Sequence, residues 1–506
     1  MDAPDTTPVA TRPWRVMLPL LLAAAAIEAT LARLTKLMSL QEFFPGKEGI
    51  SLDFVKMLGP DWMRNTWLQV TAFAVMFAAF GAALWVFHRA RPSRAMLAAL
   101  FLPPVVWSVT AASMYPPYAV DLFHNLADSR LLWIYRLNPM IVAPAARPFI
   151  IGISYADQTS SYGPLWYLLT FPAAVFQPHN FLSSIIILKL WMAAFYIASG
   201  VVIYLTLRLT RPHLALAGAA LYLWNPFVLM RDLGDGHNDV VMFFFVLLAL
   251  YFATKNEWLA VAPALMLSAL IKYVSIPLGP LVLVYVLTMP SEQRRQVLPR
   301  LLAGSGIALV MTAVISIPFL AGPRTLSALA GETRLSITST PLLVQLLLTG
   351  PFLHDSSGDI SRMLMRALFL IPYGLLLASV RPPATRLYAT SYQALWLFIL
   401  LATAWFRPWY LLWVVTMGAL LPSGWFLAVT LAISFFGMFP DITEQYRNNV
   451  PWLAVDLMRL YAAPVVVAFI PPALIWMAAL LNTRTWLFAS EPPDTAKSAV
   501  AAAAVD

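Results

Sequence analysis

Long apolar runs separated by short polar segments make up the chain from residue 14 onwards. A run of about 20 apolar residues can cross roughly 30 Å of hydrocarbon as a helix. Because only helices and closed barrels satisfy their backbone groups in lipid, we predict an all-α polytopic membrane protein with a bundle of about fourteen transmembrane helices. The predicted spans are 14–33, 66–87, 95–114, 182–206, 214–230, 239–254, 257–272, 275–289, 301–320, 361–380, 388–405, 409–422, 425–438 and 461–481.

One further apolar run, residues 162–176, is not counted as a span. It is short and contains Pro164 and Pro172, and counting it would place the basic residues after span four on the outer side. A proline-broken helix can lie at the headgroup level without crossing the bilayer. We therefore predict an interfacial or re-entrant helix here, within an early extracytoplasmic loop that covers residues 115–181.

Clusters of basic residues set the predicted orientation. Residues 88–94, which follow span two, contain one histidine and three arginines and form a compact basic turn. By the positive-inside rule this turn is cytoplasmic, so an even number of spans places both termini in the cytoplasm. The later basic turns then also lie inside: Arg294, Arg295 and Arg300, Arg381 and Arg386, and Arg484. The acidic and mixed polar segments are left on the outer side of the cell (cytoplasmic or inner) membrane, where a site is to be sought.

Composition agrees with this assignment. Hydrophobic residues make up 60% of the 506 and charged residues 11%, a balance that a soluble protein of this length could hardly tolerate. The net charge of +9 falls in short clusters between apolar runs, which argues against a nucleic-acid partner. The absence of cysteine excludes disulfide and thiolate chemistry. We expect a single membrane domain, residues 1–484, whose first span is a retained anchor, and a disordered Ala-rich cytoplasmic tail, residues 485–506.

The densest polar part of the outer loop reads Asp121-Leu-Phe-His-Asn-Leu-Ala-Asp-Ser-Arg130. As a helix it places Asp121, Asn125 and Asp128 on one face, with His124 and Arg130 close by. Two carboxylates about 10 Å apart on that face could divide the tasks of base and orienting group. A solvated helix between two spans is an equally good interpretation of this segment alone.

A second polar segment, Gly234-Asp-Gly-His-Asn-Asp239, precedes span six. Its histidine and carboxylates could ligate a metal, hold a sugar or meet a phosphate. A helix cap formed by Asn238 and Asp239 is favoured on local grounds, because both residue types prefer that position, and the two interpretations are compatible. The spacing allows a divalent metal but nothing requires one, so no metal site is predicted.

Two basic residues stand at predicted outer ends of spans. Lys272 closes an apolar run, and a snorkelling anchor is the ordinary explanation for such a lysine. Since neighbouring outer loops offer few other cations, an anionic lipid phosphate is a second candidate partner. The same alternatives apply to Arg407, whose neighbours Trp409 and Tyr410 are first of all interfacial belt aromatics.

The order of these segments resembles the GT-C superfamily of integral-membrane glycosyltransferases. Within it, the chain resembles the bacterial polyprenyl-phosphate-mannose-dependent mannosyltransferases of the actinobacterial lipomannan type. Such families place an essential aspartate in an early extracytoplasmic loop, and the resemblance implies that Asp121 is this residue. The resemblance covers roughly residues 95–415. Four pieces of sequence carry it: the Asp121 segment with Leu137-Asn-Pro139 and Tyr162-Gly-Pro-Leu165, Asn225-Pro226 with Gly236-His-Asn-Asp239, Ala269-Leu-Ile-Lys-Tyr273, and Pro408-Trp-Tyr-Leu-Leu-Trp413.

Transfer from a lipid phosphate needs little general-acid help, because the phosphate leaves readily. It needs a base for the acceptor hydroxyl and cations for the departing phosphate. We predict Asp121 as the base, with a pKa raised by partial desolvation, and Asp128 as a second catalytic residue. Lys272, His237 and Arg407 are predicted to bind the donor phosphate. Sugar or acceptor contacts are expected from His124, Asn125, Arg130, Asn138, Tyr162, Trp166, Asn238, Asp239, Trp409 and Tyr410; Tyr167 could also stack on a sugar.

The predicted function is inverting transfer of a mannosyl or other sugar from a polyprenyl-phosphate donor to a glycan or glycolipid acceptor, without another cofactor. A membrane transporter or lipid flippase is the competing class, but no internal repeat is detected and the ionisable residues crowd one interface instead of the midplane. A glycan polymerase or ligase with a pyrophosphoryl-lipid donor is a third possibility. The loop 321–360 could shape the acceptor side, although a solvated loop is favoured.

Overall fold

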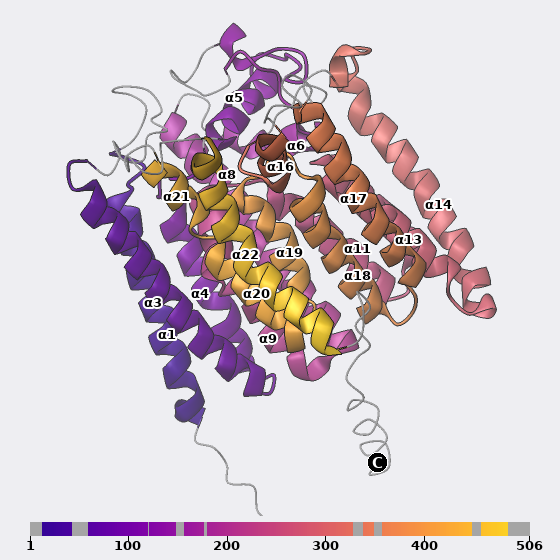
Figure 1. Cartoon of the computed structure of the whole chain (residues 1–506), viewed down its shortest axis with the longest axis horizontal. Coiled ribbons are helices and arrows are strands. Elements are labelled where there is room, and N and C mark those ends of the chain that lie inside the picture. The colour runs from indigo at the N-terminus through magenta and orange to yellow at the C-terminus, as the bar shows by residue number, and fades with distance from the viewer. Residues whose placement is uncertain are drawn as a thin grey trace, which may run out of the picture.

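The computed structural model describes residues 13–42, 59–119, 121–147, 156–176, 180–326, 337–348, 357–447 and 457–483. Within these ranges the ordered elements are all helices, without any named strand, and the long ones run side by side as a bundle (Figure 1). The predicted all-α polytopic membrane fold is confirmed. The predicted tail and part of the loop 321–360 lie outside the described residues.

The first part of the bundle consists of three long helices, a group of short ones and a fourth long helix. α1 packs against α3 and α4, and α8 packs against α4, α9 and α11. The helices are α1 (Pro13–Leu37), α3 (Trp62–Arg89), α4 (Arg94–Ala112), α5 (Asp121–Trp133), α6 (Pro164–Leu169), α7 (Phe171–Val175) and α8 (Phe181–Thr210).

The middle of the chain forms the buried centre of the bundle and then returns to its periphery. A π-helix, η3, directly precedes the turn at residues 235–238, and such helices are frequent at functional sites. The elements are α9 (Ala215–Leu223), α10 (Pro226–Val228), η3 (Leu229–Gly234), α11 (Asp239–Thr254), α12 (Trp258–Ala269), η4 (Tyr273–Ser275), α13 (Leu278–Leu287), α14 (Ser291–Ser316) and η5 (Ile317–Phe319).

The last part adds two short helices that the hydropathy pattern did not predict, α16 and α21. Both pack against the C-terminal helix α22. The elements are α16 (Thr340–Leu348), α17 (Ser357–Ser379), α18 (Ala384–Leu397), the π-helix η7 (Phe398–Ala402), η8 (Pro408–Tyr410), α19 (Leu411–Gly418), α20 (Gly424–Phe436), α21 (Pro440–Arg447) and α22 (Leu457–Thr483).

Each of the fourteen predicted spans coincides with helical structure, but the helices differ in length. In the part of the chain that the structure describes, nine helical segments are long and apolar enough to cross a membrane. Five predicted spans correspond to the shorter helices α11, α12, α13, α18 and α19. The count of fourteen crossings therefore stays a prediction.

The run 162–176 forms two short helices, α6 and α7, and not one long helix. Pro164 and Pro172 each occupy the first turn of one of them. Proline is tolerated there because the first amides of a helix have no intrahelical acceptor, whereas Pro172 would interrupt a continuous helix. The prediction of a proline-broken segment agrees with this geometry, and its position at the membrane interface stays a prediction.

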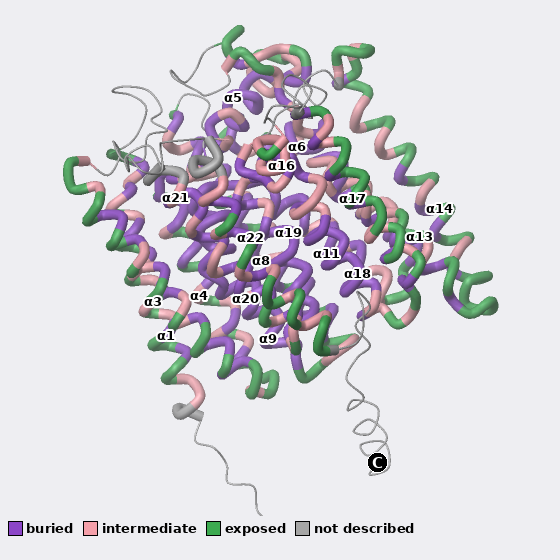
Figure 2. The backbone as a smooth tube through the Cα atoms, viewed as in Figure 1, coloured by how far each residue is buried: buried purple, intermediate pink, exposed green. Residues whose placement is uncertain are grey.

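The exposure of the residues distinguishes the interior of the bundle from its apolar outer surface. Nearly all of the segment Pro212–Gly234 is buried, while α1, α4, α14, α17 and α22 carry exposed large apolar residues. Figure 2 marks exposed positions along these outer helices. Such faces would be a liability in water but suit contact with lipid chains.

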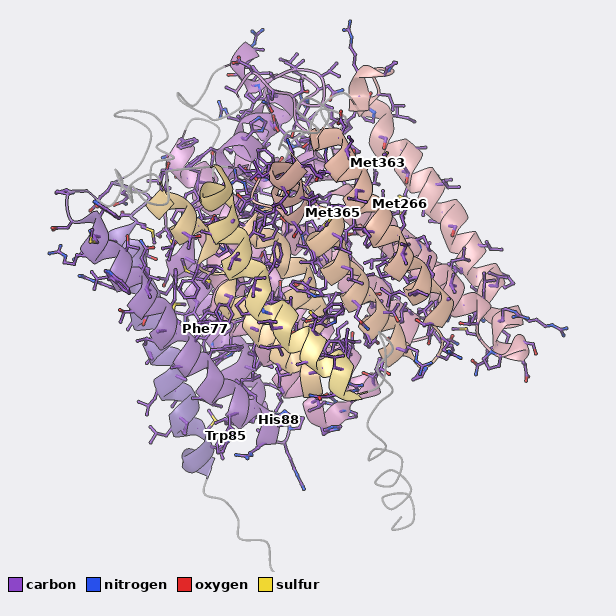
Figure 3. The ribbon with its side chains drawn as sticks, viewed as in Figure 1. Phe77, Trp85, His88, Met266, Met363 and Met365 are labelled. Carbon is purple, nitrogen blue, oxygen red and sulfur yellow. The ribbon has the colours of Figure 1, made fainter. Side chains whose placement is uncertain are left out.

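The two ends of the bundle differ in what they carry. The start of α1 and the end of α22 lie at the same end (Figure 1), and Trp85 and His88 of the predicted basic turn lie there as well (Figure 3). The helices α5, α6 and α21 lie at the opposite end (Figure 1). The polar segments selected from the sequence are therefore separated from this basic turn by the length of the bundle.

Candidate active site

Helix α5 places the predicted acidic face at one end of the bundle. Asp121 is its first residue, where a carboxylate interacts favourably with the helix dipole. Asn125 and Asp128 follow at one and two turns and are buried, whereas Asp121 is partly accessible. The Nδ1 atom of His124 lies 3.1 Å from Oδ2 of Asp128. The shared face predicted from the spacing is therefore present.

The carboxyl group of Asp121 is influenced by charges from four parts of the chain. Burial raises its pKa above the ordinary value, and Asp239 adds to this effect. Lys272, Arg407 and His124 act in the opposite direction without cancelling it. The hydroxyl of Tyr162 donates a long hydrogen bond of 3.4 Å to Oδ2 of Asp121. A weakly acidic carboxyl group and two cations thus lie within electrostatic reach of each other.

Lys272 and Asp239 form an ion pair beside Asp121. Nζ of Lys272 lies 3.1 Å from Oδ1 and 3.2 Å from Oδ2 of Asp239. Oδ1 of Asp239 also accepts a 2.6 Å hydrogen bond from Nε1 of Trp413. Asp239 is the first residue of α11 and Lys272 follows α12, so the short segment between two antiparallel helices brings them together. The pair is mostly buried, and its orientation is fixed by the tryptophan.

Aromatic rings surround the lysine ammonium. Nζ of Lys272 lies 4.7 Å from the ring centre of Tyr410, 5.6 Å from that of Trp413 and 5.8 Å from that of Tyr162. Ring faces attract a cation, most strongly where water is excluded. These contacts keep the ammonium near Asp121 and the aromatic segment around η8.

A close backbone contact explains the Tyr-Gly-Pro sequence at residues 162–164. The amide of Gly163 donates to the carbonyl of Ile271 at 2.9 Å, and that of Leu165 donates to the carbonyl of Leu270 at 3.0 Å. A Cβ atom on Gly163 would lie 2.1 Å from the Leu270 oxygen. Glycine is therefore needed for the backbone before α6 to approach the residues that lead into Lys272.

The turn before α11 lies beneath α5. Gly236 has a φ of +75°, which glycine adopts without strain, and a Cβ there would come within 3.0 Å of Leu122. The ring of His237 stacks on Trp409 at 3.9 Å between centres. Burial holds the pKa of His237 well below its ordinary range, and nearby cations lower it further. His237 is therefore neutral, and positive charge at this site comes from Lys272 and Arg407.

Arg407 precedes η8 and contributes the second cation. Its Cζ lies 5.3 Å from the ring centre of Trp405 and 5.9 Å from that of Trp409. Its side chain is partly accessible, unlike that of Trp409. Because Arg407 influences both Asp121 and His237 electrostatically, the structure brings together the three predicted phosphate-binding residues.

Asn238 occupies the N-cap position of α11, but its side chain makes no capping hydrogen bond. The prediction of a side-chain cap is wrong in this respect. Both polar atoms of this amide are buried and have no hydrogen-bond partner among the described residues. Buried polar atoms are normally satisfied by protein, by water or by a ligand. The same condition holds at predicted site residues for Nε2 of His237, Nδ2 of Asn125 and Oδ1 of Asp128.

Three predicted contact residues are engaged elsewhere or lie on another side of α5. Asn138 accepts from the amide of Met140 at 2.9 Å and donates to the carbonyl of Phe319 at 2.8 Å, so it fixes the loop against η5. Arg130 is nine residues after Asp121, which places it on the opposite side of α5. The ring of Trp166 is fully buried, and its Nε1 donates to Oδ1 of Asn125 at 3.0 Å. Tyr167 is fully buried as well, so neither ring offers an exposed face to a sugar.

Sequence reasoning missed a charged network beneath the site. The guanidinium of Arg231 in η3 lies 3.0 Å from Oδ2 of Asp235 and 2.7 Å from Oδ2 of Asp441. It also stacks 4.6 Å from the ring centre of Tyr118, whose amide donates to Asp235 at 3.1 Å. The network joins η3, α21 and the segment before α5. An arginine within an apolar stretch is the signal that could have identified it.

A second missed residue is Lys189, buried in the first third of α8. Its ammonium donates to the carbonyl oxygens of Ala111, Met114 and Gly234. These carbonyls belong to the end of α4 and the end of η3, so the lysine joins both to α8. A lysine inside a predicted span was again the available signal.

Comparison with known proteins adds one finding to this geometry. The model of a protein family described as alpha-(1->6)-mannopyranosyltransferase, N-terminal domain, matches residues 35–289, half of the chain. The matched part contains α5, Tyr162, the turn before α11 and Lys272. Arg407 and Trp413 lie beyond it. No curated protein matches the sequence. Among the described residues, no group of three or more histidine, aspartate and glutamate side chains could hold a metal ion.

Proposed function

Since the chain belongs to the alpha-(1->6)-mannopyranosyltransferase family, we propose that it transfers a mannosyl residue from a polyprenyl-phosphate donor to a hydroxyl of a glycan or glycolipid. The reaction takes place on the extracytoplasmic side of the cell membrane, with both chain termini in the cytoplasm. The observation that carries this proposal is the position of Asp121 beside Lys272 and Arg407, at the end of the bundle away from the basic turn.

The proposed chemistry is a direct displacement with Asp121 as base. The acceptor oxygen attacks the anomeric carbon while its proton passes to the Asp121 carboxylate. The bond between the anomeric carbon and the phosphate oxygen breaks, and its electron pair leaves with the polyprenyl phosphate. A raised pKa favours this role, since a carboxylate that holds its proton more strongly is a better base once it is ionised. Displacement at one face inverts the anomeric configuration.

Lys272 and Arg407 stabilise the charge that develops on the leaving phosphate. An ammonium has three N–H donors, and the two oxygens of Asp239 leave at least one of them for a phosphate oxygen. Asp239 also holds the ammonium beside Asp121 without a direct contact between Lys272 and the base. His237 is neutral and would contribute a hydrogen bond through Nε2, not a charge.

The buried polar atoms without partners support sugar recognition. Leaving such an atom unsatisfied costs about 1–3 kcal/mol, which a ligand hydroxyl can offset. Sugar hydroxyls donate and accept, so they complement both the carboxylate oxygen of Asp128 and the amides of Asn125 and Asn238. His124, Tyr162, Trp409 and Tyr410 complete the proposed sugar or acceptor contacts, and Asp128 orients the substrate.

The test is transfer by the full-length protein purified in detergent. Synthetic polyprenyl-phosphate mannose and a mannoside acceptor are supplied, and product is detected by mass spectrometry. We expect transfer by the wild type, loss of transfer in Asp121→Asn, and wild-type transfer in the control Asp157→Asn, an exposed carboxylate of the same loop. Movement of the lipid across vesicles without release of sugar would support the transporter or flippase instead. Activity with only a polyprenyl-pyrophosphate donor would indicate the third class.

A further inference from the structure

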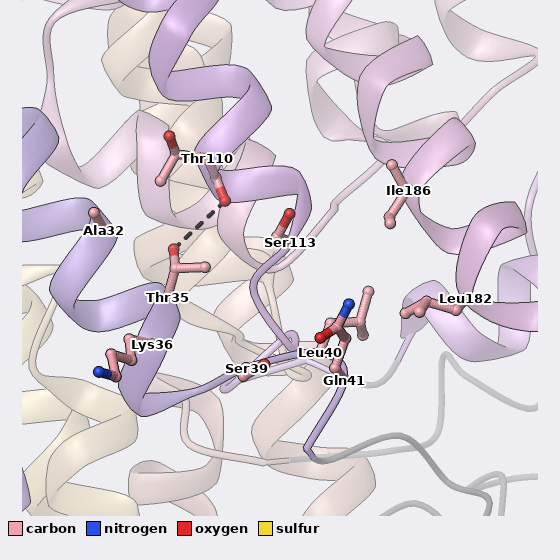
Figure 4. A pocket seen from close by; sticks show the side chains of 10 residues that line it. All are labelled: Ala32, Thr35, Lys36, Ser39, Leu40, Gln41, Thr110, Ser113, Leu182 and Ile186. Carbon is pink, nitrogen blue, oxygen red and sulfur yellow. Dashed lines mark hydrogen bonds between the residues drawn. The ribbon is translucent and has the colours of Figure 1, made fainter.

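A cavity of about 360 Å³ lies between α1, α4 and α8, away from the residues of the candidate active site (Figure 4). It lies where α1 and α4 end and α8 begins, at the same end of the bundle as α5. The residues that line it are Ala32, Thr35, Lys36, Ser39, Leu40, Gln41, Thr110, Ser113, Leu182 and Ile186.

An aromatic layer separates this cavity from the acidic face of α5. Phe123 points about 200° around the helix from Asp121. Its ring stacks on Phe181 at 5.9 Å between centres and lies 5.4 Å from the ring centre of Tyr115. Phe181 directly precedes Leu182, which lines the cavity. A ligand in the cavity is therefore not placed to give a proton to the predicted base Asp121.

The cavity has one polar wall and one apolar wall. Thr35 and Lys36 at the end of α1, and Ser39 two residues beyond it, line the polar side. The hydroxyl of Thr35 donates to the carbonyl of Thr110 on α4 at 3.5 Å, which closes this wall. Opposite it, α8 contributes Leu182 and Ile186 (Figure 4). An amphipathic molecule fits such a cavity better than a fully polar or fully apolar one.

The polar wall extends below the cavity into the bundle. The hydroxyl of Thr110 donates to Oε1 of Glu28 at 2.7 Å, and Oε2 of Glu28 is buried with no hydrogen-bond partner in the described part of the chain. Below this level, α1 and α4 turn exposed apolar side chains outward, among them Leu22, Leu102 and Val106. The cavity thus belongs to a lipid-facing part of the bundle.

Several polar side chains that line the cavity make no hydrogen bond to the part of the chain that the structure describes. Within the described ranges, the side chains of Ser39, Gln41 and Ser113 form no hydrogen bond, and no acidic side chain pairs with Lys36. Lys36 is exposed, as is Arg33. One cation, Lys36, therefore lines a cavity in which two hydroxyls and one amide make no hydrogen bond to the described residues, and Arg33 lies one turn earlier on the same helix.

We propose that this cavity binds the headgroup of an anionic phospholipid of the surrounding bilayer. The phosphate contacts Lys36, with Arg33 beside it, and the headgroup hydroxyls contact Ser113 and Gln41. The first acyl carbons pack on Ile186 and its neighbour on α8. A lipid is favoured over a soluble phosphate because the cavity combines cations with an apolar wall at the end of lipid-facing helices. This site is independent of the proposed transfer reaction, since the lipid is bound and not consumed.

Native mass spectrometry of the full-length protein in detergent tests the proposal. Phosphatidylglycerol and phosphatidylcholine with the same acyl chains are titrated in parallel. We expect the wild type to prefer phosphatidylglycerol and Lys36→Gln to bind it about fivefold more weakly, the effect of one interfacial lysine. Lys255→Gln is the matched control: Lys255 is also exposed but follows the far end of α11, so its substitution leaves binding unchanged.

A second variant, Ser113→Leu, fills the cavity and leaves the charge in place, and it is expected to weaken binding as well. Size-exclusion elution and the thermal midpoint without added lipid establish that each variant is folded. Three results would overturn the proposal: equal affinity of the wild type for both lipids, wild-type affinity in both folded variants, or displacement of the lipid by soluble glycerol phosphate at comparable concentration. The last result would indicate a site for a water-soluble phosphate.

Discussion

Nζ of Lys272 lies 3.1 Å and 3.2 Å from the two carboxylate oxygens of Asp239, and Asp239 is held in turn by Nε1 of Trp413 at 2.6 Å. The lysine therefore has a carboxylate partner before any substrate binds. Asp121 lies in the same electrostatic environment, but its pKa is raised and not lowered. The arrangement assigns the ammonium to Asp239 and leaves Asp121 able to accept a proton.

Substitution of Lys272 should slow transfer, because the charge that develops on the leaving phosphate loses a stabilising cation. We expect Lys272→Gln to lower kcat by about 100-fold, the usual loss when one group that stabilises developing charge is removed. Initial rates with polyprenyl-phosphate mannose measure this effect, and Lys255→Gln, an exposed lysine at the far end of α11, serves as the control.

The same substitution also leaves Asp239 buried without its cation, which alone can cost about 3–5 kcal/mol. The double variant Lys272→Gln with Asp239→Asn removes that charge, so it should recover the thermal midpoint but not the rate. If the double variant also recovers transfer, Lys272 has only a structural role.

Asp121→Asn should remove the base and keep the shape of the site. General-base catalysis contributes about 10²–10⁴-fold, so kcat should fall by that factor while the KM for the donor changes little. Asp157→Asn, an exposed carboxylate of the same loop, is expected to retain the wild-type rate. Comparable turnover by both variants would rule out Asp121 as the base.

The pH dependence of transfer should report the raised pKa of Asp121. The base acts when ionised, so kcat/KM should rise with pH through that pKa and then level off. The midpoint should lie above about 3.9, the value of an unperturbed aspartate. Arg407 lowers the pKa of Asp121, so Arg407→Gln should move the acidic limb to higher pH. A limb that stays in place in this variant would mean that another group titrates.

The position of Asp121 also has a consequence for stability. A carboxyl group whose folded pKa is raised stabilises the protein in its protonated form, below the unfolded pKa, and this stabilisation is lost as pH rises through the folded value. Asparagine cannot ionise, so Asp121→Asn should have a higher thermal midpoint than the wild type at pH 7. The difference should shrink as the pH approaches 4. A lower midpoint for the variant at pH 7 would contradict the raised pKa.

The elements and the polar face of the site followed from local patterns. The predicted span 239–254 has the same limits as α11, because an apolar run with a polar turn before it leaves little choice of register. The spacing of Asp121, Asn125 and Asp128 placed them on one helical face for the same reason. Lys272 and Arg407 were selected because a charged residue at the end of a membrane span costs free energy and therefore often has a function.

Contacts between distant segments could not be predicted in this way. Nothing near Trp166 in the sequence indicates that it donates to Asn125, and nothing near Asn138 indicates that it holds η5. The π-helix η3 also has no simple hydrophobic period, so its arginine was not assigned a partner. These interactions depend on how the helices pack against one another. Local patterns in one sequence do not indicate which distant segments will meet.

The buried network of Arg231 supplies the last prediction. Removing the guanidinium leaves Asp235 and Asp441 without their cation in the interior, which typically destabilises a protein by about 3–5 kcal/mol. Arg231→Met should therefore lower the thermal midpoint strongly. Arg64→Met is the matched control, because Arg64 and its partner Asp61 are mostly exposed and such surface pairs contribute about 0–1 kcal/mol.

A triple variant separates charge burial from packing at the same network. Arg231→Met combined with Asp235→Asn and Asp441→Asn removes all three charges while keeping nearly the same volume, and the amide oxygen introduced at position 235 could still accept from the backbone N–H of Tyr118. Replacing a complete buried ionic group is often close to neutral. The triple variant should therefore recover most of the midpoint lost in Arg231→Met. If it is as unstable as the single variant, the contacts of the guanidinium with the Tyr118 ring and with the backbone between α20 and α21, and not its charge, hold η3 in place.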